Sequence, residues 1–233
     1  MHSRLHAATC AAAVAAAITT LANSEPSVIF TDATGDIDPG LATGNGTLDL
    51  VSLEISNTTS DIVFKLTVNG NLSTDWGKFM IGISNGGAAS NNGNGWNRPI
   101  NMDSPNGGMT RWIGSWVDGG GGSQVWSFAG GWSQDPGNAG LVFNGSELTY
   151  TLSLASLGLN VGDTFFFDAY SSGGGGGDGA IDALANPNIS VNSWSSNYTS
   201  GGSNPIFSYT VVPAPGVIAL AGVAGLLRRR RTR

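Results

Sequence analysis

Cysteine and histidine are nearly missing from this chain. Its 233 residues include one cysteine, Cys10, and two histidines, His2 and His6. All three precede residue 23, so residues 23–210 contain no thiol, no imidazole and no disulfide. This absence excludes Ser-His-Asp and Cys-His catalysis, and also zinc, copper or iron sites built on histidine. What remains is carboxylate chemistry and cations coordinated by oxygen, such as calcium.

Basic side chains are also scarce. All 16 acidic residues lie between Glu25 and Asp182, where the only basic residues are Lys65, Lys78, Arg98 and Arg111. This stretch therefore has a net charge of −12, whereas the whole chain has −6. A surface of that sign repels nucleic acid and anionic lipid, which both need a basic footprint. We expect no nucleic-acid partner, and most of the carboxylates are explained by solubility alone.

The first 22 residues have the pattern of a secretory signal peptide. Arg4 precedes an alanine-rich apolar run over 7–21, and Ala22 supplies a small residue at the expected cleavage position. Such segments are removed from the mature protein and take no part in its fold. We therefore expect an exported domain over 23–210, a length typical of a single sandwich or barrel.

The segment 211–233 combines three features in order. Pro213, Ala214 and Pro215 come first, an apolar span over 216–227 follows, and the Arg cluster 228–233 closes the chain with Arg228, Arg229, Arg230 and Arg231. An apolar stretch next to concentrated positive charge stops in a membrane with its basic end in the cytoplasm. The span would make about 18 Å of helix, whereas a hydrocarbon core is about 30 Å thick. This favours a temporary anchor; a permanent anchor and a basic tail on a buried helix are the alternatives.

This tail resembles the PEP-CTERM sorting signal of bacterial exosortase substrates, with Ala214 in place of the usual glutamate. The resemblance implies an exosortase-like processing enzyme as a partner. It also implies that a C-terminal helix anchors the chain transiently in the inner membrane, before the protein reaches the cell surface or the extracellular matrix.

The residues between the two signals predict an all-β domain. Apolar and polar side chains alternate with a period of two in 62–68, 79–83 and 148–154, as in strands with one buried and one wet face. Further strands are expected at Val28–Thr31, Leu48–Ile55, Arg111–Val117, Gln124–Phe128, Leu141–Phe143, Thr164–Tyr170 and Pro205–Val211. Six Asn-x-Ser/Thr sequences predict polar surface loops, at Asn45, Asn57, Asn71, Asn144, Asn188 and Asn197. Short strands at this spacing predict a single jelly-roll-like β-sandwich.

A second resemblance concerns the front half of this domain. The order of Asp32–Asp36, Leu48–Ile55, Ile62–Val68 and Trp76–Ile83, with a later Gly158–Asp168 stretch, is similar to DOMON-like and family 9 carbohydrate-binding-module sandwiches. It implies a jelly-roll-like fold whose relatives bind sugars or haem. Haem is disfavoured, because the exported domain has no histidine to ligate it.

The tryptophans are the candidate binding residues. Trp112 and Trp116 share one face of a strand, and residues 118–122 can connect this strand to the next as a hairpin. Flat indole rings on a rigid sheet suit the CH face of a pyranose, and arginines beside them can bond its hydroxyls. The predicted carbohydrate-binding set is Trp96, Arg98, Arg111, Trp112, Trp116, Trp126 and Trp132. The alternative for Trp112 and Trp116 is that they fill the core.

Two groups of acidic residues could bind calcium. Asp32, Asp36 and Asp38 stand in one loop, and Asp178 and Asp182 follow a run of glycines. Neither group has the EF-hand spacing, and both also fit simple turns. A glycosidase needs two carboxylates that face each other across a cleft, and no sequence pattern identifies such a pair. We therefore expect a protein that is not an enzyme.

Two classes of function follow from these observations. The chain is either a structural or adhesive component of the cell surface or extracellular matrix, or a surface-displayed module that binds extracellular polysaccharide through its tryptophans.

Overall fold

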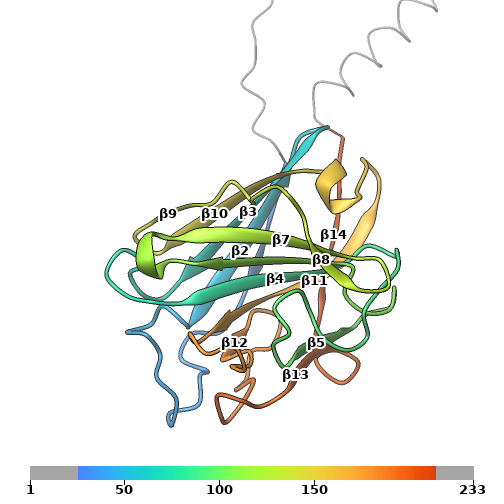
Figure 1. Ribbon diagram of the computed structural model, residues 1–233. Helices are drawn as coiled ribbons and strands as arrows, with labels where there is room; N and C mark the ends of the chain where they lie inside the picture. The colour runs from blue at the N-terminus through green and yellow to red at the C-terminus, as the bar shows by residue number, and fades with distance from the viewer. Residues whose placement is uncertain (1–25, 214–233) are drawn as a thin grey trace, which may run out of the picture.

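The computed structural model describes residues 26–213. The predicted signal peptide over 1–22, the apolar span over 216–227 and the Arg cluster 228–233 lie outside the described residues, as do Ala214 and Pro215. Within residues 26–213, no helix has the length and apolar character needed to cross a membrane. This part of the chain is nearly all β and forms a sandwich of two sheets, as the sequence predicted (Figure 1).

The first sheet has five antiparallel strands in the order β1-β2-β3-β10-β9. In β3, Ile62, Phe64 and Leu66 are buried while the residues between them are partly exposed, because successive side chains of a strand point to opposite faces. The five strands are β1 (Ser27–Thr31), β2 (Leu50–Asn57), β3 (Asp61–Val68), β10 (Glu147–Ser153) and β9 (Val142–Asn144).

The second sheet has seven strands. Six follow the order β12-β11-β4-β6-β7-β8, and β14 pairs with the first half of β11. They are β12 (Asp182–Ala183), β11 (Thr164–Ser172), β4 (Lys78–Ser84), β6 (Arg111–Trp116), β7 (Gly122–Phe128), β8 (Trp132–Gln134) and β14 (Phe207–Thr210). A parallel pair, β5 (Ile100–Asp103) and β13 (Tyr198–Gly201), stands apart from both sheets.

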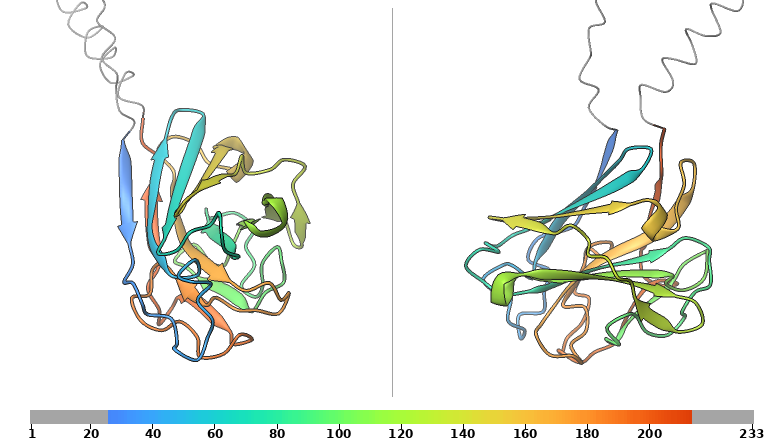
Figure 2. Two further views of the ribbon diagram at one scale, coloured as in Figure 1. Left: turned by 90° about the vertical axis from the view of Figure 1, so that its left-hand side faces the viewer. Right: turned by 45° about the horizontal axis from the view of Figure 1, so that its top comes forward.

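Both faces of the second sheet contribute side chains to buried clusters. On β4, Phe79 and Ile81 point into the core shared with the first sheet, whereas Met80 belongs to a separate cluster on the outer face. Long connections cover that outer face: residues 85–110, which include β5, and residues 173–206, which include β13 (Figures 1 and 2). The strand pattern therefore loses its alternation, and every residue of β4 after Lys78 is buried.

The predicted strands are present, and four short ones were missed. β5, β8, β12 and β13 have two to four residues each, too few for an alternation of apolar and polar residues to stand out in the sequence. The hairpin through 118–122 is confirmed, with the 3-10 turn η1 (Asp118–Gly120) between β6 and β7. A second 3-10 turn, η2 (Ala155–Leu157), follows β10.

Asn57 corrects the prediction that every Asn-x-Ser/Thr sequence marks a surface loop. It ends β2, it is 0 % exposed, and its side chain holds the end of the described chain. Its amide Nδ2 donates to the carbonyl of Val212 at 2.8 Å. Its Oδ1 accepts from the Val212 backbone N–H at 3.1 Å and from the Tyr209 hydroxyl at 2.7 Å. The chain therefore leaves the domain through a buried clamp, at the same end as β1 begins (Figure 1).

Candidate functional site

The outer face of the β6–β7 hairpin alternates large and small side chains. Trp112 pairs across the hairpin with Trp126, while Trp116 pairs with Gly122. Because residues two apart share a face, Gly114 and Gln124 lie between these pairs on the same side of the sheet. The hairpin therefore presents indole rings separated by gaps that lack large side chains.

A shallow trough of about 410 Å³ runs along this face. Three of its lining residues are tryptophans that are partly exposed, Trp96, Trp116 and Trp126. The centroids of the Trp96 and Trp116 rings lie 6.4 Å apart, and the ring planes are tilted by 43°. The other residues that line the trough are Lys78, Gly95, Arg98, Gln124 and Gly176.

Glycines let the rings approach the backbone closely. A Cβ added to Gly114 would lie 2.3 Å from Cζ2 of Trp96, and one added to Gly122 would lie 2.3 Å from Cζ2 of Trp116. Such distances are far inside van der Waals contact. The two rings are therefore seated on glycine positions of β6 and β7, and any larger residue there would displace them.

Gln124 fixes two of the rings. The indole Nε1–H of Trp96 donates to Gln124 Oε1 at 2.7 Å, and that of Trp126 donates to the same oxygen at 3.2 Å. An indole can only donate, so the amide oxygen must face both rings and the amide nitrogen must point elsewhere. Within residues 26–213, Gln124 Nε2 donates no hydrogen bond, which leaves this donor available to a ligand.

Arg98 is a supporting residue of the trough. Its guanidinium carbon lies 5.5 Å from the Trp96 ring centroid, and the residue is only 6 % exposed. Nη1 donates to Ser172 Oγ at 2.7 Å and to the Asp178 carbonyl at 3.1 Å, and Nη2 donates to the Gly173 carbonyl at 3.2 Å. Burial lowers the pKa of the guanidinium, an effect that the charge of Asp178 partly offsets. Arg98 therefore attaches the 173–178 loop to the trough instead of reaching outward as the sequence suggested.

Three other predicted residues lie elsewhere. Trp112 is 0 % exposed and stacks on Tyr170, with ring centroids 6.0 Å apart, so it belongs to the core. Trp132 packs edge-on against Phe128 at 5.5 Å and does not line the trough. Arg111 is odd-numbered on β6 and therefore points to the opposite face from Trp112.

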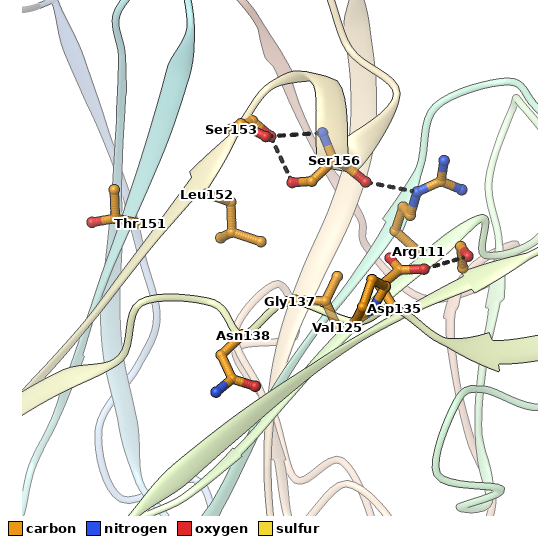
Figure 3. Close-up of a pocket in the computed structure, with 11 residues that line it drawn as sticks. Arg111, Val125, Asp135, Gly137, Asn138, Thr151, Leu152, Ser153 and Ser156 are labelled. Atoms are coloured by element: carbon orange, nitrogen blue, oxygen red, sulfur yellow. Dashed lines mark hydrogen bonds between the residues drawn. The ribbon is translucent and has the colours of Figure 1, made fainter.

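Arg111 lines a cleft between the two sheets (Figure 3). The cleft has a volume of about 480 Å³ and is bounded by β6, β7, β10, η2 and the residues that follow β8. Arg111 Nε donates to the Ser156 carbonyl at 3.3 Å, and Ser127 Oγ donates to Asp135 Oδ1 at 2.8 Å (Figure 3). No aromatic ring is among its described lining residues, and these polar groups already have protein partners. The trough is therefore the better candidate for binding a sugar.

A group of three carboxylates lies at a second place. One carboxylate oxygen from each of Asp32, Asp36 and Asp182 lies within 4.8 Å of the others. Asp38, predicted with the first two, is outside this group, and its Oδ1 accepts from the Gly40 N–H at 2.8 Å. Asp178 accepts from the Gly175 N–H at 2.7 Å and is also outside it.

Burial raises the pKa of two of these carboxyls far above the usual range. It raises the pKa of Asp32 to about 8, with repulsion from Asp36 as a further cause. It raises the pKa of Asp182 to about 9, against the opposing effect of the hydrogen bond from the Leu50 N–H. The pKa of Asp36 is also raised, mainly by burial. No positively charged group among residues 26–213 offsets these shifts, so the ionised carboxylates have no counter-charge.

Gln124, Lys78 and the two glycines under the rings, Gly114 and Gly122, belong to the site but were not predicted from the sequence. A sequence signal for them existed, because Trp112, Gly114 and Trp116 alternate on one face of a strand, as do Gly122, Gln124 and Trp126 on the next. The sequence pattern placed Asp182 in a group with Asp178, and no local spacing relates it to Asp32.

Comparison with known proteins gives no relative: the chain matches no protein-family model, no curated protein and no solved structure. The function is therefore inferred from the residues and the geometry described above.

Proposed function

We propose that the domain is a non-catalytic module that binds extracellular polysaccharide in the tryptophan trough, and that the chain is exported and displayed at the cell surface. The observation that carries the binding proposal is the partial exposure of Trp96, Trp116 and Trp126 along one hollow. Indole rings offer apolar area to the CH face of a pyranose while polar groups beside them bond its hydroxyls. Gln124 Nε2 is such a polar group.

The form of the trough supports binding without catalysis. Glycosidases use two carboxyl groups that flank the scissile bond. Among the described residues that line the trough there is no carboxylate, and the charged ones are Lys78 and Arg98. Lys78 Nζ also donates to Asp118 Oδ1 at 2.6 Å, which holds this cation at the rim.

The rings are also held in place before any ligand arrives. Trp96 is bonded to Gln124 and packed on Gly114, and Arg98 lies beside it. A rigid site loses little conformational entropy when it binds, which favours affinity for an extended, flexible chain. The proposed fold relation, a jelly-roll-like sandwich similar to carbohydrate-binding modules, is consistent with this role.

We expect Trp116→Ala to lower the affinity for a bound polysaccharide about tenfold or more, because it removes one stacking face and about 1.4 kcal/mol corresponds to a factor of ten. The measurement is affinity electrophoresis of the full chain in native gels. The gels contain xylan, mixed-linkage β-glucan, hydroxyethylcellulose or alginate. The full chain is run in a detergent without a sugar headgroup, so that the detergent does not compete for the trough. The matched control is Trp132→Ala, which deletes the same side chain outside the trough.

Two results would contradict binding at the trough. One is unretarded migration of the wild-type chain in every polysaccharide. The other is an equal loss of retardation in the Trp116→Ala and Trp132→Ala variants.

Display at the surface rests on a different observation, the order of Pro213-Ala214-Pro215, an apolar span and Arg228–Arg231. We expect replacement of Arg228–Arg231 by alanine to leave an unprocessed precursor in the membrane fraction, because these charges hold the cytoplasmic end of the segment. Intact-mass measurement of membrane and surface fractions checks this, with Arg233→Ala as the control. Normal processing and display of the four-alanine variant would refute the sorting proposal.

A further inference from the structure

The carboxylates of Asp32, Asp36 and Asp182 converge from distant parts of the chain. Asp32 directly follows β1 of the first sheet, and Asp36 stands in the same loop. Asp182 opens β12, at the edge of the second sheet. Their nearest carboxylate oxygens all lie within 4.8 Å of one another. The group therefore joins the two layers of the sandwich.

Three of these oxygens are buried and have no hydrogen-bond partner: Oδ2 of Asp32 and both carboxylate oxygens of Asp36. Buried polar atoms in folded proteins are nearly always paired, and a buried charge without a partner is costly. The orphan oxygens are thus an observation separate from the clustering itself. They indicate that a ligand from outside the polypeptide binds here and contacts these oxygens.

No basic side chain supplies that group. The three ion pairs among residues 26–213 all involve Lys65 or Lys78 and lie elsewhere. Asp182 is 1 % exposed, and its two oxygens accept from the backbone N–H groups of Leu50 at 2.7 Å and Ala183 at 2.8 Å. These bonds orient the carboxylate but carry no counter-charge.

The surroundings hold the ligands in position. The Asp49 carboxylate accepts the Gly35 N–H at 3.0 and 3.2 Å, which fixes the loop between Asp32 and Asp36. Asn69 Nδ2 in turn donates to Asp49 Oδ2 at 3.0 Å. Asp49 therefore supports the loop without being one of the three converging groups.

We propose that Asp32, Asp36 and Asp182 bind one calcium ion, which ties the loop after β1 to β12. The chemistry of the donors selects the ion: all are hard carboxylate oxygens, and the domain has no histidine or cysteine that would attract a softer metal. Two oxygens bound to one calcium at 2.3–2.6 Å can be up to about 5 Å apart, whereas magnesium at 2.0–2.1 Å holds them within about 4 Å. Backbone carbonyls and water supply the remaining ligands that calcium takes.

The first test is calcium binding by the full chain after treatment with EGTA. Isothermal titration with calcium chloride at pH 8 is expected to show one site per chain. At about a hundredfold excess over Kd, calcium is expected to raise Tm by about 5–10 °C, and an equal concentration of magnesium by less. The absence of binding heat together with equal Tm values in calcium and in EGTA would overturn the proposal.

A pair of variants tests the assignment of the ligands. Asp36→Asn keeps the shape of the side chain and removes a charge that makes no hydrogen bond. It is expected to weaken calcium binding at least tenfold, and also to raise Tm in EGTA because it relieves repulsion within the group. Asp38→Asn is the matched control, two residues further on and outside the group, and is expected to keep the wild-type calcium response. An unchanged response in Asp36→Asn, or an equal loss in both variants, would show that these carboxylates are not the ligands.

The proposed calcium site and the tryptophan trough are independent of each other. A chain that binds calcium but no polysaccharide would support the calcium site and refute the proposed function. A chain that binds polysaccharide but no calcium would support the proposed function and refute the calcium site.

Discussion

Trp112→Ala is expected to lower the free energy of unfolding by about 3–5 kcal/mol, the range for deleting a large aromatic side chain from a core. Trp112 is fully buried, stacks on Tyr170 and lies 6.4 Å edge-on from Trp96. Its Nε1 has no hydrogen-bond partner, so the loss comes from packing and the cavity left behind. Urea denaturation of the full chain, followed by circular dichroism, measures the effect.

Trp116→Ala is the natural comparison, because Trp116 lies on the same face of the same strand but is partly exposed. We expect it to cost less than half as much stability as Trp112→Ala. Trp112→Phe, which keeps an aromatic ring against Tyr170, should recover part of the loss. A cost below about 1 kcal/mol for Trp112→Ala would mean that the outer cluster is not a packed core.

Gly114→Ala is expected to abolish most of the polysaccharide binding although it adds only one carbon atom. The new Cβ would lie 2.3 Å from Cζ2 and 2.5 Å from Cε2 of Trp96, so the ring must move. Trp96 would then leave its hydrogen bond to Gln124, and the trough would lose its shape. We also expect a loss of about 1–3 kcal/mol in unfolding free energy, as for other overpacked sites. Affinity electrophoresis and urea denaturation measure the two effects.

Gly131→Ala is the matched control. It makes the same change in the turn between β7 and β8, where an added Cβ meets no atom within 4 Å. This variant should bind and unfold like the wild type. If Gly114→Ala also behaves like the wild type, Trp96 does not depend on its seat and the trough tolerates a different arrangement of rings.

Alternation with a period of two predicted most strands, because it reflects the geometry of the strand itself, but it predicted only one strand pairing, the hairpin through 118–122. It also contained the answer for Arg111, which is one residue from Trp112 and must point to the other face. Arg98 and Arg111 both flank the tryptophans in the sequence, yet they belong to different sites. For Arg111, its position in β6, and not its nearness to the tryptophans in the chain, decided that it could not reach the rings.

How deeply each side chain is buried could not be predicted from the alternation. Trp112 and Trp116 have the same phase on β6, but long connections cover the first and leave the second partly exposed. The path of those connections depends on contacts such as Arg98 with Ser172, 74 residues away in the chain. Asp182 joined Asp32 for the same reason, since a sheet edge brought together segments that no local spacing relates.

If the proposed sorting signal anchors the chain at its C-terminal end, the clamp on Asn57 has a mechanical consequence. A pull on Pro213 first meets the two bonds between Asn57 and Val212. It then reaches β14, which pairs with β11 from Phe207 to Thr210. The clamp joins the end of the described chain to β2 of the first sheet, and β14 joins it to β11 of the second, so a pull on this end acts on both sheets. Forced unfolding is limited by the height of the barrier and not by equilibrium stability. Under the proposed anchoring, the short strand β14 would therefore not bear the tension alone.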